Sequence, residues 1–226
     1  MAIIFNDTFT EGSNTALASH TPDTGTSWTE TFSTSAGVRV LQVEAGADVI
    51  RCSGNSGDFG LIYTADVSYP SANYEVQATF LTTFDTLTPI YILARIQDVE
   101  NMIALRLVLS SGGSNAQLYK KIAGTWSTVG SAVTIADGSV VLLSVNGSAV
   151  KVYDDAVEVI SETISDAEVA AAGKAGLGHG GGAELPISTD NTRSTSMIDS
   201  FSVNDLGSGA TAVKDMIGSG IIPFAR

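Results

Sequence analysis

The sequence is poor in charged side chains, and its one cysteine, Cys52, has no second cysteine to pair with. Charged residues make up 15% of the 226 residues and hydrophobic residues 44%, a balance that argues against an intrinsically disordered chain. A lone cysteine forms no internal disulfide and no thiolate metal cluster. We expect Cys52 to be buried and unreactive, because neither His20 nor His179 lies near it in the sequence.

Basic residues are scarce as well. The chain holds 11 lysines and arginines against 24 aspartates and glutamates, and the basic residues are scattered along it. Nucleic-acid binding needs a basic stripe for the phosphates, so we expect no nucleic-acid partner. No apolar run approaches the roughly 20 residues of a membrane-spanning helix, and the opening MAIIFNDTF lacks the basic start of a signal peptide. We therefore expect neither secretion nor a membrane partner.

What the sequence does have is a succession of short apolar segments separated by turn residues. Glycine contributes 23 residues, and serine and threonine are abundant. Turn signals at short intervals indicate a sandwich or barrel of antiparallel strands within one large domain. The pattern predicts β segments near 3–9, 37–43, 47–52, 59–64 and 73–82, a hairpin around DVEN (98–101), a tight turn at Ala123-Gly124, and further strands to 206.

The segment Val141–Asp155 predicts two tight turns. Asn146-Gly147 favours a type I′ hairpin, because both residues tolerate positive φ. That turn would pair Val145 with Ser148. Alternation along the strands then places five apolar side chains on one dry face: Val141, Leu143, Val145, Val150 and Val152. For the next turn, Asp154-Asp155 is favoured over Asp155-Ala156, because alanine disfavours positive φ.

One short helix is expected between the strands. In ISDAEVAAAGKAG, Ser165 and Glu168 have the spacing of a capping box, and an alanine-rich stretch follows them. Gly173 suits the C-terminal end of a helix. The pattern therefore predicts a helix at about 166–172.

An ordered set of segments then carries a resemblance to a known family. The segments are NDTF, ILARIQDVENMIALRL, LYKKIAGTWSTV, VLLSVNGSAVKVYDDAVEV, GKAGLG and MIDSFSVNDL. Together they resemble the concanavalin A-like lectin and glucanase jelly roll in its laminin-G-like form. The resemblance implies an all-β, antiparallel two-sheet jelly-roll sandwich over residues 1–206. The stretch DTFTEGSNTALASHTPDTGTSWTE is also similar to the start of lectin-like modules in tailed-bacteriophage structural proteins.

The sequence offers little for catalysis. Glucanases of this fold use a Glu-x-Asp-x-x-Glu strand, and EVISE at Glu158–Glu162 lacks the central aspartate and the spacing. GHGGG at 178–182 has no nucleophile motif beside it, so close strand packing explains it better. We expect no catalytic residue and no cofactor. Asp7 and Asp199 form a candidate calcium pair in the first and last strands, although strand-end or turn-capping roles are the favoured alternative.

Sugar binding is the function that the family resemblance implies. Aromatic rings stack on sugar faces, and polar side chains bind the hydroxyls. The candidate glycan-binding residues are Tyr91, Arg95, Asn101, Arg106, Tyr119 and Trp126. Aromatic residues make up only 7% of the chain, so in the alternative interpretation Trp28 and Trp126 both belong to the core. Arg95 and Arg106 would then form only the solvated face of a hairpin.

The composition changes after Leu206. Residues 207–226 begin with a Gly-Ser-Gly hinge and end in an apolar stretch. We predict a C-terminal docking tail that binds another subunit through Val213, Met216, Ile217, Ile221, Ile222 and Phe224. In the alternative interpretation, the tail folds back onto its own sandwich.

These features together predict a non-enzymatic bacteriophage virion protein that is assembled in the host cytoplasm. A capsid decoration or cement protein is the first interpretation, because the chain is small and has a single domain. The alternatives are a tail-associated or receptor-binding carbohydrate-binding module and, after these, a glycoside hydrolase. The expected partners are capsid or tail subunits, further copies of the chain in a homo-oligomer, and a glycan.

Overall fold

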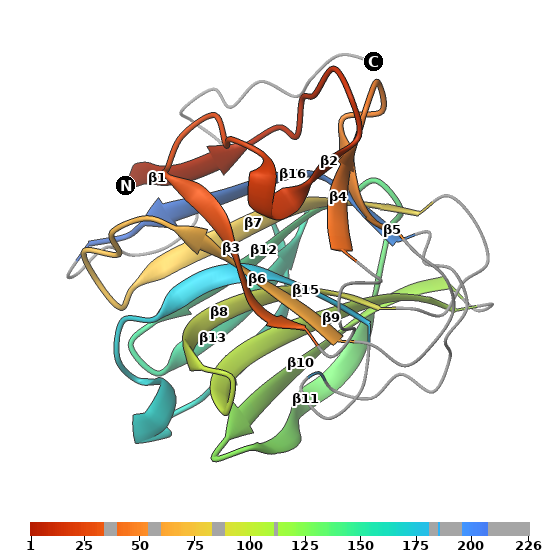
Figure 1. Ribbon diagram of the computed structural model, residues 1–226. Helices are drawn as coiled ribbons and strands as arrows, with labels where there is room; N and C mark the ends of the chain where they lie inside the picture. Colours follow the sequence, from red (N-terminus) through yellow and green to blue (C-terminus); the bar gives the residue numbers. More distant parts are fainter. Residues whose placement is uncertain are drawn as a thin grey trace.

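Two antiparallel β-sheets packed face to face make up the protein, as Figure 1 shows. The computed structural model describes residues 1–33, 40–53, 60–82, 89–110, 113–180, 185 and 196–207. In this part of the chain the helical segments are two 3₁₀ turns, η1 (Leu17–Ser19) and η2 (Ala167–Val169), and neither crosses a membrane. The predicted all-β, antiparallel jelly-roll sandwich is confirmed.

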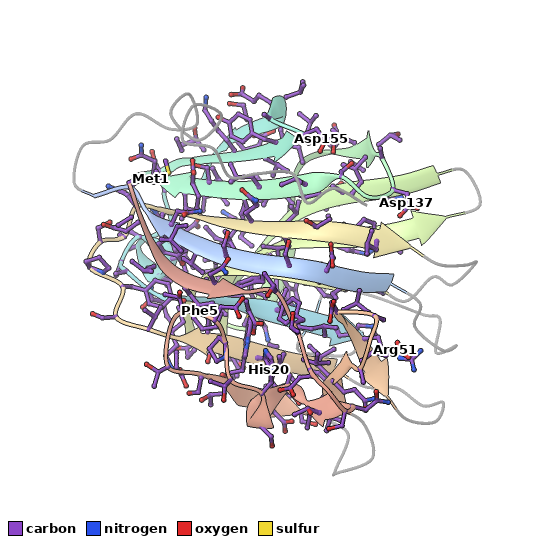
Figure 2. The ribbon with its side chains drawn as sticks, turned by 90° about the horizontal axis from the view of Figure 1, so that it is seen from above. Met1, Phe5, His20, Arg51, Asp137 and Asp155 are labelled. Carbon is purple, nitrogen blue, oxygen red and sulfur yellow. The ribbon has the colours of Figure 1, made fainter. Side chains whose placement is uncertain are left out.

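One layer is a nine-stranded sheet, whose strands β1, β16 and β7 lie in the upper part of Figure 1. Its hydrogen-bonded order is β14 (Val157–Thr163), β13 (Ala149–Asp154), β12 (Val140–Asn146), β7 (Tyr74–Thr82), β16 (Ser196–Asp205), β5 (Val49–Ser53), β4 (Val40–Glu44) and β2 (Thr15–Ala16). β1 (Ala2–Asp7) pairs with β16, so the first and last strands are neighbours. Figure 2 shows the outer face of this sheet from above.

The other layer is a seven-stranded sheet, whose strands β10 and β11 lie at the bottom of Figure 1. Its order is β11 (Thr125–Ile135), β10 (Gly113–Ile122), β9 (Asn101–Ser110), β8 (Ile90–Asp98), β15 (Lys174–Gly180), β6 (Gly60–Asp66) and β3 (Ser27–Ser33). The predicted hairpin around DVEN joins β8 to β9, with Asp98 paired to Asn101. The predicted turn at Ala123-Gly124 joins β10 to β11, and both residues have positive φ, as a type I′ turn requires.

The main core lies between the two sheets and takes alternate side chains from both. The predicted dry face of β12 and β13 is confirmed, because all five of its side chains are buried in this core: Val141, Leu143, Val145, Val150 and Val152. A fully buried side chain of this kind contributes about 1.5–3 kcal/mol. The period-two pattern alone was therefore enough to orient this hairpin.

The predicted register of that hairpin was wrong. Asn146 pairs with Ala149, so the central turn residues are Gly147 and Ser148 rather than Asn146 and Gly147. Gly147 has φ +58°, which fits the first central position of a type II′ turn. The shift brings Val145 opposite Val150 and leaves every side chain on the predicted face.

The preferred position of the next turn was also wrong. Asp154 pairs with Val157, so the turn lies at Asp155-Ala156, with φ values of +46° and +68°. Asp155 stabilises this register, since its carboxylate accepts a hydrogen bond from the backbone N–H of Val140 at 2.9 Å. That contact outweighs the local cost of positive φ at alanine.

The predicted helix at 166–172 is only the 3₁₀ turn η2, Ala167–Val169. Asp166 occupies the N-cap position, and it makes no side-chain capping bond. Its carboxylate instead pairs with Lys120 at 2.6 Å, while Val169 is buried in the core. Tertiary contacts therefore limit the alanine-rich stretch to a single turn.

Sequence patterning missed β3, Ser27–Ser33, which lies at the edge of the seven-stranded sheet. Its sequence SWTETFS is mostly polar, and only Trp28 among its seven residues is buried. Trp28 was the available signal, because it is only 2% exposed and packs edge to face against Phe5 and Phe201 at 5.0 Å. Cys52, predicted to be buried, is half-buried beside the core. The docking residues of the predicted tail, Val213 to Phe224, lie outside the described residues.

Candidate functional site

The outer face of the seven-stranded sheet carries the candidate site. Cross-strand pairing sets out three rows of side chains on the face opposite the main core. The first row is Gln117, Arg106, Tyr91, Gly178, Ile62 and Phe32; the second is Thr128, Tyr119, Ala104, Leu93, Gly176 and Thr64; the third is Trp126, Lys121 and Met102.

These rows rest on a second, smaller apolar cluster. It joins Tyr91, Leu93 and Met102 to their neighbours on the outer face, and both Tyr119 and Trp126 pack against it. Gly178 keeps the cluster compact, because a Cβ there would lie 3.1–3.3 Å from Leu185, Leu93 and Tyr91. This supports the prediction of close packing at the GHGGG stretch, as far as Gly180. Packing against this cluster therefore fixes the positions of the side chains on the outer face.

Three side chains of the outer face, which we call the diagonal patch, lie on adjacent strands and in successive rows. Arg106 is on β9, Tyr119 on β10 and Trp126 on β11. With strands about 4.8 Å apart and two residues rising about 6.6 Å, the Cα atoms of Arg106 and Trp126 are about 16 Å apart. Tyr119 and Trp126 meet edge to face, with ring centroids 6.4 Å apart and planes at 89°. All three side chains are half-buried, so each also has an open side.

Lys121 holds the tryptophan end of the diagonal patch in place. Its Nζ lies 5.6 Å from the Trp126 ring centroid and donates a hydrogen bond to the carbonyl of Val99 at 2.8 Å. The side chain is only 1% exposed, so its positive charge lies under the indole rather than in solvent. The Trp126 Nε1–H is buried and has no hydrogen-bond partner within the protein. Trp126 therefore offers its ring, rather than this enclosed N–H, to the surface.

Arg106 forms the other end. Its side chain hydrogen-bonds with the hydroxyl of its cross-strand neighbour Tyr91, while its Nε is buried without a partner. Burial raises the pKa of Tyr91, and the positive charge of Arg106 acts in the opposite direction. Tyr91 has no exposed surface, so it supports Arg106 from below and presents no open ring face.

Two of the predicted glycan-binding residues have structural roles instead. Arg95 has no exposed surface, because a register shift after Ala94 takes it out of the alternating rows. Asn101 is half-buried and uses both ends of its amide within turns. Its Nδ2 donates to Asp98, and its Oδ1 accepts from the backbone N–H of Ala123. The structure thus brings together Arg106, Tyr119 and Trp126, with Tyr91 beneath them.

Asp7, half of the candidate calcium pair, serves a different purpose. Its buried carboxylate accepts hydrogen bonds from the Trp28 indole at 2.6 Å, from His20 Nε2 at 2.8 Å and from its own turn at Phe9 N, also at 2.8 Å. Burial raises the pKa of Asp7, and these bonds act in the opposite direction. Three N–H donors occupy most of the lone pairs of this carboxylate, so the turn-capping alternative fits better than calcium.

Asp199, the other half, is half-buried on β16, and burial together with the nearby Asp48 raises the pKa of its carboxyl. Asp7 pairs with Phe201, so Asp199 lies on β16 outside the stretch that pairs with β1. Within the described residues, no three His, Cys, Asp or Glu side chains gather in an arrangement that could hold a metal ion.

His20 links this cluster to the loop after β1, and Figure 2 places it near Phe5 on the β1 side of the molecule. Its Nδ1 lies 2.7 Å from Glu11 Oε1, so both ring nitrogens contact carboxylates. Burial lowers the pKa of His20, but the bonds to Glu11 and Asp7 outweigh it, and the net shift is upward. The folded protein therefore favours the imidazolium, which donates on both sides.

The raised pKa of His20 predicts a pH-dependent stability. A group whose pKa is higher in the folded than in the unfolded chain stabilises fully below its unfolded pKa, about 6.5 for histidine. We expect the free energy of unfolding to fall as the pH rises from there through the raised pKa. Urea unfolding across this range measures it. The His20→Gln variant should show a flatter profile, and an unchanged slope in that variant would contradict the assignment.

Comparison with solved structures supports the β-sandwich fold. The carbohydrate-binding module CBM66 from Bacillus subtilis superposes with a TM-score of 0.53 and 12% identity, over 79% of this chain and 95% of that one. Domain 4 of AbnA, a GH43 extracellular arabinanase from Geobacillus stearothermophilus in complex with arabinotriose, superposes with a TM-score of 0.51 and 17% identity. The match covers 90% of this chain and 92% of that domain. The GH43 protein BlXynB from Bacillus licheniformis superposes with a TM-score of 0.57 and 12% identity, over 88% of this chain and 39% of that one.

The likeness to these structures shows a shared β-sandwich, because the identities are low. This chain spans about two fifths of the BlXynB chain, and nearly all of the two smaller domains. No family model and no curated protein matches the sequence. These comparisons give no support to the predicted place in a bacteriophage particle.

Proposed function

We propose that the protein is a non-catalytic carbohydrate-binding domain, and that glycan binds along the diagonal patch Arg106–Tyr119–Trp126. The observation that carries this proposal is the pair of half-buried rings, Tyr119 and Trp126, fixed edge to face. Two of the superposed structures are a carbohydrate-binding module and a domain complexed with an arabinotriose, each covered almost entirely by this fold.

The chemistry of the patch suits a sugar chain. A pyranose or furanose ring offers an apolar C–H face and a rim of hydroxyls, so it needs both an aromatic surface and hydrogen-bond donors. Tyr119 and Trp126 supply the first, and the Arg106 guanidinium supplies the second. Because β-strands and the cluster beneath fix these side chains, little conformational entropy is lost when a ligand binds.

The composition of the same rows supports binding without hydrolysis. Glycoside hydrolysis uses a pair of carboxyl groups on either side of the scissile bond. The three rows of the outer face contain no aspartate or glutamate. The proposal is therefore of a module that retains a glycan and leaves its bonds intact.

Replacing Trp126 with alanine tests the proposal directly. We expect the affinity for the glycan that the native protein binds best, chosen from a polysaccharide panel, to fall at least about tenfold, because large aromatic side chains dominate such contacts. Isothermal titration calorimetry measures the change. Ile3→Ala, which removes a 51% exposed apolar side chain from the opposite sheet, is the matched control and should bind normally. Equal affinities of Trp126→Ala and the native protein would disprove the location, and a panel without any binding would disprove the function.

Attachment to a virion remains a prediction from the sequence. A receptor-binding module of a phage tail would use a glycan site of this kind, so the two ideas are compatible. The partner subunits expected for the tail residues 207–226, and a homo-oligomer, remain predictions too. Density-gradient sedimentation of the protein with purified particles would test them.

A further inference from the structure

We propose that the diagonal patch selects acidic glycans, with a uronic-acid carboxylate bound at Arg106. This inference rests on the proposed function and names its ligand class. The first observation behind it is a local reversal of charge. The whole chain has a formal net charge of −13, but the three rows of the outer face contain two cations, Arg106 and Lys121, and no carboxylate.

The second observation concerns how the cations of the described chain are neutralised. Arg51, Lys120, Lys151 and Lys174 each pair with a carboxylate, and the buried Arg95 donates to backbone carbonyls. No ion pair in the described part of the chain includes Arg106. Its bond to the Tyr91 hydroxyl is to a neutral group, and its Nε is buried without a partner. A half-buried guanidinium in this state has lost hydration without gaining an anion.

Arginine chemistry identifies the missing anion. The guanidinium is planar and presents its N–H donors as a fork that matches the two oxygens of a carboxylate. A sugar hydroxyl would satisfy one donor and leave the charge uncompensated. A uronic-acid carboxylate would satisfy both, and it would reach Arg106 while neighbouring sugar units extend along Tyr119 towards Trp126.

Charge at the far end of the patch fixes the direction of the ligand. The β8–β9 turn beside Lys121 carries Asp98 and Glu100, and the Glu100 carboxylate lies against Gly124 in the turn before Trp126. An acidic group at that end would face these carboxylates. The structure therefore assigns the acidic group of the ligand to Arg106 and an uncharged sugar face to Trp126.

A pair of matched ligands tests the assignment. Polygalacturonate and its methyl ester share one backbone and differ in charge; alginate and hyaluronan present carboxylates on other backbones, and xylan and levan are neutral. We expect calorimetry at low salt to give at least about tenfold tighter binding of an acidic polymer than of its ester or of the neutral polymers. Raising the ionic strength should weaken the acidic complex only.

Two variants complete the test. Arg106→Gln should remove the preference for the acidic polymer and lower the affinity for a neutral polymer far less, because the glutamine amide still offers an N–H donor to a sugar hydroxyl. Lys151→Gln removes the same charge from the opposite sheet and should preserve the preference. Equal binding of acid and ester, or an unchanged preference in Arg106→Gln, overturns the inference and leaves the proposed function standing. Failure to bind any polymer in the panel overturns the proposed function and the inference with it.

Discussion

Replacing Asp7 with alanine should lower the free energy of unfolding by about 3–5 kcal/mol, because the substitution leaves a buried positive charge and two N–H groups without acceptors. Asp7 has no exposed surface, and it is the shared acceptor of His20, Trp28 and the backbone N–H of Phe9. The two side chains come from different elements. The carboxylate therefore joins the first strand, the loop after it and the edge strand β3.

Asp7→Asn separates charge from volume in the same experiment. The amide fills the same space, yet it places an N–H₂ group against donors and neutralises the partner of the His20 imidazolium. We expect a loss similar to that of Asp7→Ala, measured by urea unfolding below pH 6.5. Asp23→Ala removes an exposed acceptor of Thr8 on the same loop and should cost less than about 1.5 kcal/mol. A loss of less than about 1 kcal/mol in Asp7→Asn would contradict the ionic role.

Replacing Arg95 with methionine should cost a similar amount, about 3–5 kcal/mol, because three carbonyl oxygens would lose a charged donor at the end of the sandwich. The guanidinium donates to Ala72 at 3.0 Å, to Gly147 at 2.7 Å and to Val169 at 3.2 Å. These carbonyls belong to the segment before β7, to the β12–β13 turn and to η2. Burial lowers the pKa of Arg95, and the hydrogen bonds to the three carbonyl oxygens compensate the buried guanidinium for its lost hydration.

Arg95→Lys provides the sharper comparison. A single ammonium on a shorter stem cannot reach three carbonyls in the plane of a guanidinium, so we expect most of the loss to persist. Arg51→Met is the control, since its side chain is 42% exposed and pairs with Glu44 at the surface. That pair should be worth no more than about 1 kcal/mol. A near-native stability of Arg95→Lys would show that charge alone, rather than the fork of donors, stabilises this end.

The diagonal patch was only partly predictable from the sequence. Arg106, Tyr119 and Trp126 were proposed because aromatic rings and polar side chains suit a sugar ligand, and the structure places all three on the outer face. The same reasoning nominated Arg95 and Asn101, which the structure uses internally. A change of register after Ala94 takes Arg95 off the outer face, and Asn101 lies at the turn between β8 and β9. A β-bulge of this kind depends on the neighbouring strands, and no local sequence pattern predicts it.

By itself, the sequence determined the all-β sandwich, the buried face of β12 and β13, and the hairpins at DVEN and Ala123-Gly124. These follow from local rules, because alternation sets the face of a strand and glycine or asparagine permits positive φ. Only the tertiary structure decided the registers at Gly147 and Asp155, the shortening of the predicted helix, and the buried roles of Asp7 and Arg95. The side-chain partners of Asp7 lie 13 and 21 residues away, and the carbonyl partners of the Arg95 guanidinium lie 23–74 residues away, so these energies depend on contacts that exist only after the sheets have packed.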